Sequence, residues 1–277
     1  MRIALKIEYD GRRYAGWQYQ AHSPSIQALV ETALGRIAAH PVRTVASGRT
    51  DAGVHALEQI VHFDTEAERP ERAWVQGTNT QLPEDVRVVW ARQVEPGFHA
   101  RNQALARWYR YRILNRPVAS ALLCGRVTWW YHFLDVERMQ AGAAYLIGEH
   151  DFSSFRGPYC QSRSPFRRVY LLEVARVGEE VWVDVVANAF LHNMVRNIVG
   201  VLIAIGSGKE PPEWAGEVLA ARSRSAAGIT APADGLYLAG VWYPERFGLP
   251  RQPIFGRLPQ DLRRVNCHFE RSEKSSG

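Results

Sequence analysis

One order of strand and helix patterns occurs twice along this sequence, and that repetition constrains the fold more than any other feature. In residues 3–9 apolar side chains stand at every second position, which predicts a strand with one buried face. Residues 24–39 have apolar side chains at helical spacing, and Ser23 before Pro24 predicts an N-cap followed by the first helical residue. The other patterns of this first round predict strands over 42–46, 59–64 and 86–94 and a helix from Pro70 past Trp74.

The second round repeats this order. It predicts a strand over 107–114, a helix over 136–147, strands over 169–177 and 181–186, a helix over 191–205 and a strand over 236–242. Two such units favour an α+β fold with one extended, mainly antiparallel sheet, helices on one face and the other face free for a ligand. We predict an N-terminal half over 1–105, a C-terminal half over 106–248, and a basic, disordered tail over 249–277.

The charge of the chain indicates a polyanionic partner. The net charge is +6 and the isoelectric point is about 9.4, and clustered cations gain free energy by releasing counterions from phosphates. Residues 249–277 contain six basic and three acidic side chains, so the tail contributes half of the excess. The body of the protein is therefore only mildly basic.

The cysteines and the apolar runs restrict where the protein works. The three cysteines are odd in number and form no C-x-x-C pair, which argues against a disulfide framework or a thiolate metal site and favours the cytoplasm. The chain starts directly with a strand pattern, so no signal peptide is expected. The longest apolar run, over 198–205, is too short to cross a bilayer, and we expect no membrane association.

The densest polar cluster lies in residues 47–56, between predicted strands. Gly48 and Gly53 permit a tight loop, and Arg49, Asp51 and His55 bring a cation, an anion and a hydrogen-bonding ring together. A D-A-G step can also be a simple turn whose carboxylate caps local backbone groups, so both interpretations stay open. No zinc, phosphate-loop, dinucleotide or serine-nucleophile motif is present, and 206–209 is predicted to be a helix C-cap.

A second cluster, over 98–112, mixes aromatic and basic side chains. On a strand, Tyr109 and Tyr111 share one face, and Trp108, Arg110 and Arg112 share the other. This pattern suits unstacked RNA bases and phosphates, or equally an aromatic core face with a solvated arginine face.

A third cluster, over 190–200, is predicted to be a helix that is apolar on most sides. Arg196 on such a helix is expected to be partly buried and to need an anion, for which Asp51 is the candidate. The alternative is an exposed arginine.

Together the clusters resemble the tRNA pseudouridine synthase A family, in family order and over roughly residues 1–250. The segments that carry the resemblance are Y-D-G-R-R-Y-A-G-W-Q (9–18), G-R-T-D-A-G-V-H-A (48–56), F-H-A-R (98–101), Y-R-Y (109–111), D-F-S-S-F (151–155), C-Q-S-R-S-P (160–165), F-L-H-N-M-V-R-N-I-V-G (190–200) and G-L-Y-L (235–238). Asn102, Gln103 and Trp108 depart from the family pattern, which puts local packing and RNA contacts in doubt.

The resemblance implies two RRM/ferredoxin-like halves with an RNA cleft, a homodimer, no metal and no organic cofactor. The implied substrate is the tRNA anticodon stem-loop, with uridines at positions 38–40 converted to pseudouridine. The implied site residues are Asp51 as the catalytic carboxylate, Tyr109 stacked on the target base, Arg196 paired with Asp51, Leu236 as an apolar contact, Arg49 holding the flipped base, and His55 and Arg101 as further substrate contacts.

The chemistry of the residues agrees with these roles. Isomerising uridine requires cleaving the bond from C1′ to N1, rotating the base and joining C5 to C1′, and the base must leave its stack. A carboxylate can attack sugar C1′ or base C6, and both paths stay open. A non-catalytic RNA-binding protein would be expected to lack Asp51 or Tyr109, and an RNA hydrolase or glycosidase would be expected to show a second acid or a metal cluster.

Overall fold

The computed structural model describes residues 1–250 of the 277, and these form two compact units. Unit 1 contains residues 1–105 and returns at 237–250, and unit 2 contains 106–236. The chain comes back to unit 1 because the strand that starts at Leu236 pairs with a strand of that unit. The sequence prediction had instead placed 237–248 in the C-terminal half. The predicted tail lies, from residue 251 on, outside the described residues.

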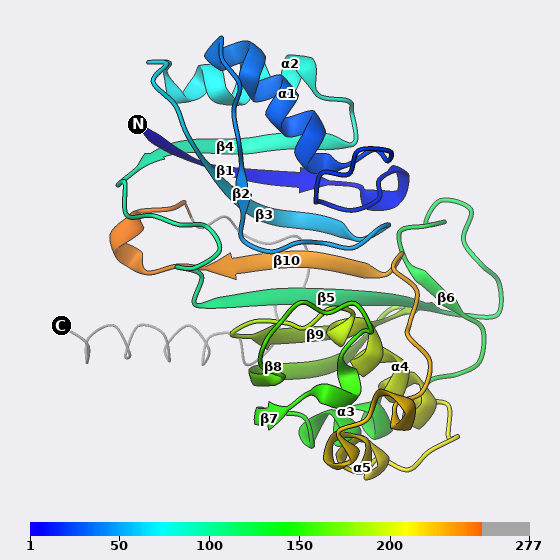
Figure 1. Ribbon diagram of the computed structural model, residues 1–277. Coiled ribbons are helices and arrows are strands. Elements are labelled where there is room, and N and C mark those ends of the chain that lie inside the picture. The colour runs from blue at the N-terminus through cyan, green and yellow to red at the C-terminus, as the bar shows by residue number, and fades with distance from the viewer. Residues whose placement is uncertain (251–277) are drawn as a thin grey trace. The chain divides into compact units, whose positions relative to one another are not determined.

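Unit 1 is built on four main strands in the order β4-β1-β3-β10. β1 pairs antiparallel with β3 and β4, β10 pairs parallel with β3, and the short β2 pairs with β3. The helices α1 and α2 lie side by side (Figure 1), and a π-helical turn, η2, leads directly into α2 and contacts α1 and β4. The elements are β1 Arg2–Tyr9, η1 Gly11–Arg13, α1 Ile26–Ala38, β2 Val45–Ala46, β3 His55–Asp64, η2 Ala73–Gly77, α2 Thr78–Gln81, β4 Val86–Val94, β10 Leu236–Trp242 and η5 Glu245–Phe247.

Unit 2 has the strand order β5-β9-β8-β7, all antiparallel, with a short β6 parallel to β5. Helix α3 packs on β8 and on α4 and α5. The elements are β5 Ala106–Asn115, β6 Thr128–Trp130, α3 Val136–Ala144, β7 Gly148–Asp151, η3 Ser153–Phe155, β8 Phe166–Val177, β9 Glu180–Ala187, α4 Met194–Gly206, α5 Trp214–Ala221 and η4 Arg224–Ala226. The predicted class, α+β with mainly antiparallel strands, is confirmed, while the RNA cleft stays a prediction.

Several element boundaries differ from the sequence prediction. Helix α1 is capped by Ser25, whose hydroxyl accepts from the backbone N–H of Ala28 at 3.4 Å, so the predicted cap at Ser23 is wrong. Helix α4 starts at Met194 because Asn193 has a left-handed backbone, with φ of 58°, and interrupts the predicted helix. The predicted C-cap at 206–209 is confirmed, since Ser207 and Gly208 donate back to the last turn.

Candidate active site

Asp51 lies on a loop of unit 1 between β2 and β3, which we call the Asp51 loop (residues 47–54). Asp51 is partly exposed and Arg49 is exposed, whereas Thr50 between them is buried. The backbone carbonyl of Asp51 accepts from the N–H of Val54 at 3.1 Å, which closes a tight turn. Asp51 therefore lies in a tight turn and is partly accessible to solvent.

The first motif of the chain, residues 9–18, holds this loop through main-chain hydrogen bonds. The N–H of Trp17 donates to the carbonyl of Thr50 at 3.0 Å, and the N–H of Gly53 donates to the carbonyl of Tyr14 at 3.3 Å. The two bonds are on opposite sides of Asp51 in the sequence. Segment 9–18 is thus the scaffold of the Asp51 loop, a relation that the sequence patterns did not reveal.

Two glycines of the same motif allow this close approach. A Cβ added at Gly11 would lie 2.0 Å from the carbonyl oxygen of Val54, and one added at Gly16 would lie 2.4 Å from that of Thr50. Gly16 also has φ of +100°, a conformation that L-residues rarely adopt. No larger residue fits either position without moving the loop.

A buried side-chain network supports the loop from below. Gln59 on β3 is fully buried; its Oε1 accepts from the Ser47 hydroxyl at 2.7 Å, and its Nε2 donates to the Gly48 carbonyl at 2.7 Å and to the Tyr9 hydroxyl at 3.5 Å. The Tyr9 hydroxyl in turn lies 2.7 Å from Oγ1 of Thr50. Burial raises the pKa of Tyr9 to about 12, so its phenol keeps its proton for hydrogen bonding.

His55, a predicted substrate contact, is buried. Its ring is 2% exposed, stacks on Tyr237 with centroids 4.6 Å apart, and accepts at Nδ1 from the N–H of Gly11 at 3.1 Å. Asp10 approaches the same nitrogen at 3.3 Å. The imidazole thus joins β3 to the scaffold segment, and the contact of His55 with substrate stays a prediction.

Arg101 is exposed at the end of a segment that the core holds firmly. Nδ1 of His62 accepts from the N–H of Ala100 at 3.1 Å, and the Tyr243 hydroxyl donates to the carbonyl of Ala100 at 2.5 Å. Burial lowers the pKa of His62 to about 4, so its neutral ring remains an acceptor. The guanidinium of Arg101 thus projects from a fixed backbone, which suits a contact with an anion.

In unit 2, Tyr109 is 8% exposed on β5. The ring of Phe190 meets it edge to face, with centroids 4.9 Å apart and planes at 83°. Leu236, at the start of β10, is 6% exposed. Both side chains are therefore held by packing, as positions that contact a base would need to be.

Arg110 and Arg112 do not form the RNA-facing or solvated row that their spacing suggested. Arg110 is 3% exposed, and its Nε and Nη2 donate to Asp184 at 2.9 and 3.0 Å. Trp108, one of the departures from the family pattern, donates from Nε1 to the same carboxylate at 2.7 Å, and Arg112 pairs with Glu180 at 2.6 Å. These arginines are committed to cross-strand ion pairs, because β5 and β9 align them with acidic partners.

Arg196 projects from the first turn of α4 and is partly buried, as its apolar surroundings predicted. Its Nε donates to the carbonyl of Ala231 at 2.7 Å and its Nη1 to Oδ1 of Asn193 at 3.2 Å. Asn197 next to it is 1% exposed, donates to the carbonyl of Phe155 at 2.8 Å and accepts from the Thr230 hydroxyl. The two hydrogen bonds of Arg196 fix the direction of its guanidinium. The pairing of Arg196 with Asp51 stays a prediction.

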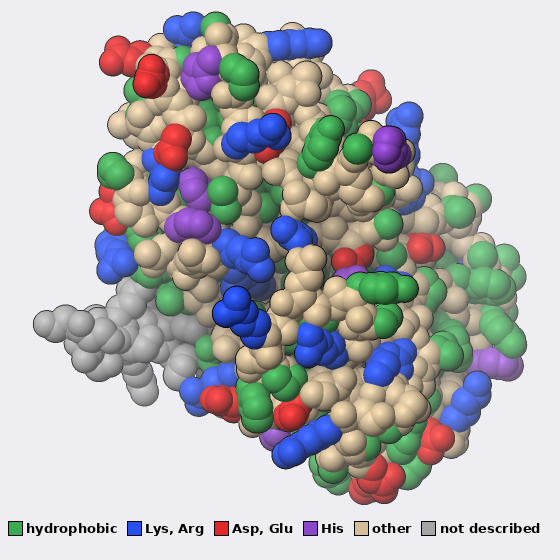
Figure 2. Space-filling model, viewed as in Figure 1, with side chains coloured by type: hydrophobic (Ala, Val, Ile, Leu, Met, Phe, Trp, Pro, Cys, Tyr) green, Lys and Arg blue, Asp and Glu red, His purple; other side chains and the backbone are tan. Residues whose placement is uncertain are grey.

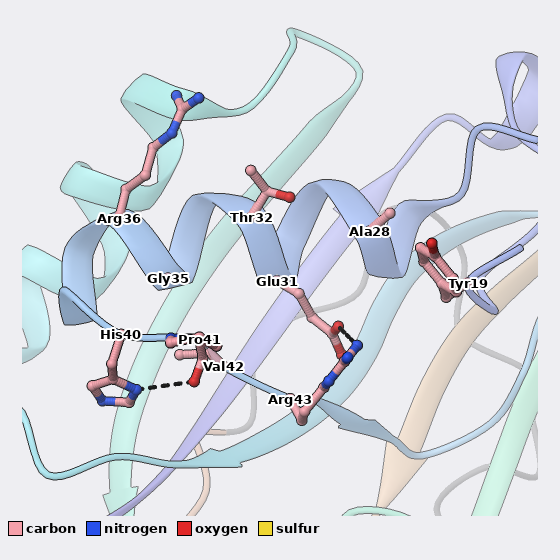
Figure 3. A pocket seen from close by; sticks show the side chains of 10 residues that line it. All are labelled: Tyr19, Ala28, Glu31, Thr32, Gly35, Arg36, His40, Pro41, Val42 and Arg43. Carbon is pink, nitrogen blue, oxygen red and sulfur yellow. Dashed lines mark hydrogen bonds and ion pairs between the residues drawn. The ribbon is translucent and has the colours of Figure 1, made fainter. Parts of the chain in front are cut away.

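A separate pocket of about 570 Å³ lies beside α1 in unit 1 (Figure 3). Its lining residues are Tyr19, Ala28, Glu31, Thr32, Gly35, Arg36, His40, Pro41, Val42 and Arg43. Its acidic group is already occupied, because Glu31 pairs with Arg43 at 3.1 Å and accepts from the N–H of Thr44 at 2.8 Å. The lining includes none of the predicted site residues, so this pocket is not the candidate active site.

Neither a membrane-spanning helix nor a cluster of metal ligands occurs within residues 1–250. No helix among these residues is long and apolar enough to span a membrane. Within the same range, no group of three or more His, Cys, Asp or Glu side chains is placed to hold a metal ion. The expectation that no metal or organic cofactor is needed stays a prediction.

The fold and the site define an α+β protein that presents a carboxylate on a preorganised loop. A family model described as tRNA pseudouridine synthase matches residues 6–101 and 143–244. Proteins described as tRNA pseudouridine synthase A are similar over nearly their whole length: that of Methylococcus capsulatus is 62% identical over 95% of this chain and 97% of its own, and that of Coxiella burnetii is 54% identical over 91% and 97%. That of Nitrosococcus oceani is 54% identical over 91% and 97%.

The chain therefore belongs to the tRNA pseudouridine synthase family. It is an isomerase, and tRNA pseudouridylation is the activity of this family.

Proposed function

We propose that this enzyme isomerises uridine to pseudouridine in the anticodon stem-loop of tRNA, at positions 38–40. The observation that carries the proposal is the Asp51 loop, where a partly exposed carboxylate stands on a backbone held on both sides by hydrogen bonds to segment 9–18. A fixed nucleophile needs no reordering when the substrate arrives, which lowers the entropic part of the barrier.

The reaction requires a carboxylate and a base that has left its stack. Asp51 attacks either sugar C1′ or base C6, and the bond from C1′ to N1 breaks. The detached uracil then rotates and C5 bonds to C1′. On the C1′ path, C5 displaces the Asp51 carboxylate from C1′; on the C6 path, the carboxylate leaves C6 as the C5=C6 double bond re-forms. On both paths C5 loses its hydrogen as a proton, N1 gains one and Asp51 is free again. The product is an isomer, so the reaction consumes no oxidant, reductant or water.

Other side chains have roles in this proposal that follow the family resemblance. Tyr109 stacks on the target base, Leu236 excludes water beside it, and Arg196 stabilises the charge of the Asp51 carboxylate. Arg49 holds the base in its flipped position, and both Arg49 and Arg101 are exposed, so that RNA can reach them. We do not assign His55 to the substrate, because its ring stacks on Tyr237 and its Nδ1 accepts from the N–H of Gly11.

The enzyme is also proposed to be a homodimer that works in the cytoplasm. Hydrophobic side chains gather over β6 and the loops on both sides of it (Figure 2): Val118, Leu122, Trp129, Tyr131 and Phe133 are 71%, 85%, 45%, 56% and 73% exposed. Exposed apolar clusters of this kind are typical of surfaces that another chain covers. Cys160 is a free thiol, which agrees with a reducing compartment. Sedimentation of the wild type and of Phe133→Asp tests the dimer, which the charge should weaken.

The decisive experiment is tritium release from tRNA labelled at uridine C5. We expect release by the wild type, none by Asp51→Asn, and an intact RNA strand in both reactions. Transcripts with cytidine at positions 38, 39 and 40, singly and together, locate the modified base. If the folded wild type releases no tritium from unmodified tRNA, the proposed function is wrong and a role limited to RNA binding takes its place.

A further inference from the structure

The network beneath the Asp51 loop contains a feature that stability alone does not require. Gln59 is fully buried on a strand, where an apolar side chain would avoid the cost of removing an amide from water. Its amide instead reaches the first two residues of the loop, Ser47 and Gly48. Polar groups that are buried and fully hydrogen-bonded specify one arrangement of the backbone around them.

The second arm of the network reaches the residue that directly precedes Asp51. The Tyr9 hydroxyl accepts from Nε2 of Gln59 and has its proton left to donate to Oγ1 of Thr50, 2.7 Å away. The raised pKa of Tyr9 keeps this proton in place across the working pH range. Gln59 therefore acts on both ends of the short segment from Ser47 to Thr50.

We propose that Gln59 and Tyr9 are positioning residues for the isomerisation, and that together they set the direction in which the Asp51 carboxylate projects. Neither side chain is assigned to the substrate, because Gln59 is fully buried and the buried Tyr9 hydroxyl bonds Gln59 and Thr50. They act through Ser47, Gly48 and Thr50. This inference rests on the proposed role of Asp51 and adds the residues that orient it.

The first test compares two glutamine variants. Gln59→Leu removes the hub of the network. Gln140→Leu is the control, because Gln140 likewise uses both its amide oxygen and its amide nitrogen, to the backbone of Val174 and Leu172, but lies in unit 2. At saturating enzyme, Gln59→Leu should lower the single-turnover rate of tritium release about 100-fold, as expected for a displaced catalytic group, with the tRNA Kd changed less than about twofold. Gln140→Leu should change neither quantity.

A second test covers the case in which Gln59→Leu does not fold. Tyr9→Phe and Thr50→Val each remove one end of the 2.7 Å hydrogen bond without changing side-chain shape. Each should slow the single turnover about tenfold, and the double variant should be no slower than the slower single variant, because both remove the same bond. Circular dichroism verifies that these variants fold.

Three results separate the possible failures. Wild-type rates in Tyr9→Phe, or multiplying effects in the double variant, would overturn the positioning role. Equal rates in the folded Gln59→Leu and Gln140→Leu enzymes would also overturn it. A wild type that forms no pseudouridine would instead contradict the proposed function itself.

Discussion

Gly16→Ala, which adds one methyl group to segment 9–18, should lower both the stability and the activity of the enzyme. The alanine must adopt φ near +100°, and its Cβ would lie 2.4 Å from the carbonyl oxygen of Thr50, about 1 Å inside ordinary contact at 3.4 Å. The backbone conformation costs about 1–2 kcal/mol for a non-glycine residue. Overpacking against a backbone atom adds about 1–3 kcal/mol, so the total loss should be about 2–5 kcal/mol.

Gly178→Ala is the control for the backbone term. Gly178 also has positive φ, +60°, in the turn between β8 and β9, but an added Cβ would meet nothing within 4 Å. Urea titration should show a loss of about 1–2 kcal/mol for this control and the larger loss for Gly16→Ala. Tritium release should fall at least tenfold in Gly16→Ala, because the loop shift displaces Asp51, and should not change in Gly178→Ala. Equal stability and full activity in both variants would refute the reasoning.

Three further outcomes are expected. Asn197→Leu should lower the free energy of unfolding in urea titration by about 2–4 kcal/mol, because the Thr230 hydroxyl and the Phe155 carbonyl both lose their hydrogen bond to Asn197. Unchanged stability would show that water replaces the amide. Asp184→Ala should lower the free energy of unfolding by about 3–5 kcal/mol, because it leaves Arg110 buried without its carboxylate. The double variant Arg110→Met with Asp184→Leu should recover most of this loss. Weaker tRNA binding by the folded double variant would support the predicted contact of Arg110 with RNA. The pKa of His62 is lowered to about 4 from 6.5, so between these values the unfolded chain holds a proton that the folded protein lacks. Stability should therefore fall as pH decreases through this window, and the urea midpoint of His62→Gln should fall less; parallel curves would contradict the assignment.

The sequence was a good guide where apolar residues are periodic along one element. The strand at 3–9 and the helix that follows it are both present, and the helix buries one face. The prediction that the strand buries only one face is wrong, because Ala4 and Lys6 on its other face are also buried. The short β6 and β7 and helix α5 were not predicted, since a few residues cannot display a period. The cap of α1 was placed two residues early, because Ser23 and Ser25 both suit an N-cap and only the backbone path selects between them.

The site shows the same division. The polarity and the glycines of residues 47–56 marked the Asp51 loop, but His55 had the same local signal as Asp51 and is buried against Tyr237. The sequence pattern suggested that Arg110 could contact phosphate, but β9 pairs it with Asp184, which is 74 residues away in the chain. A local pattern reports which side chains are polar, and it does not report which distant partner neutralises them.

The sequence by itself determined the chemistry that the chain can offer and the class of fold, because both follow from residue types and periodicities within short segments. Only the tertiary structure decided that segment 9–18 is the scaffold of residues 47–54, that Gln59 and Tyr9 support the same loop, and that the chain after Leu236 returns to unit 1. The physical reason is that these relations depend on strand register and on backbone approach at single glycines. Such contacts join residues far apart in the chain and become definite only when the whole unit has folded.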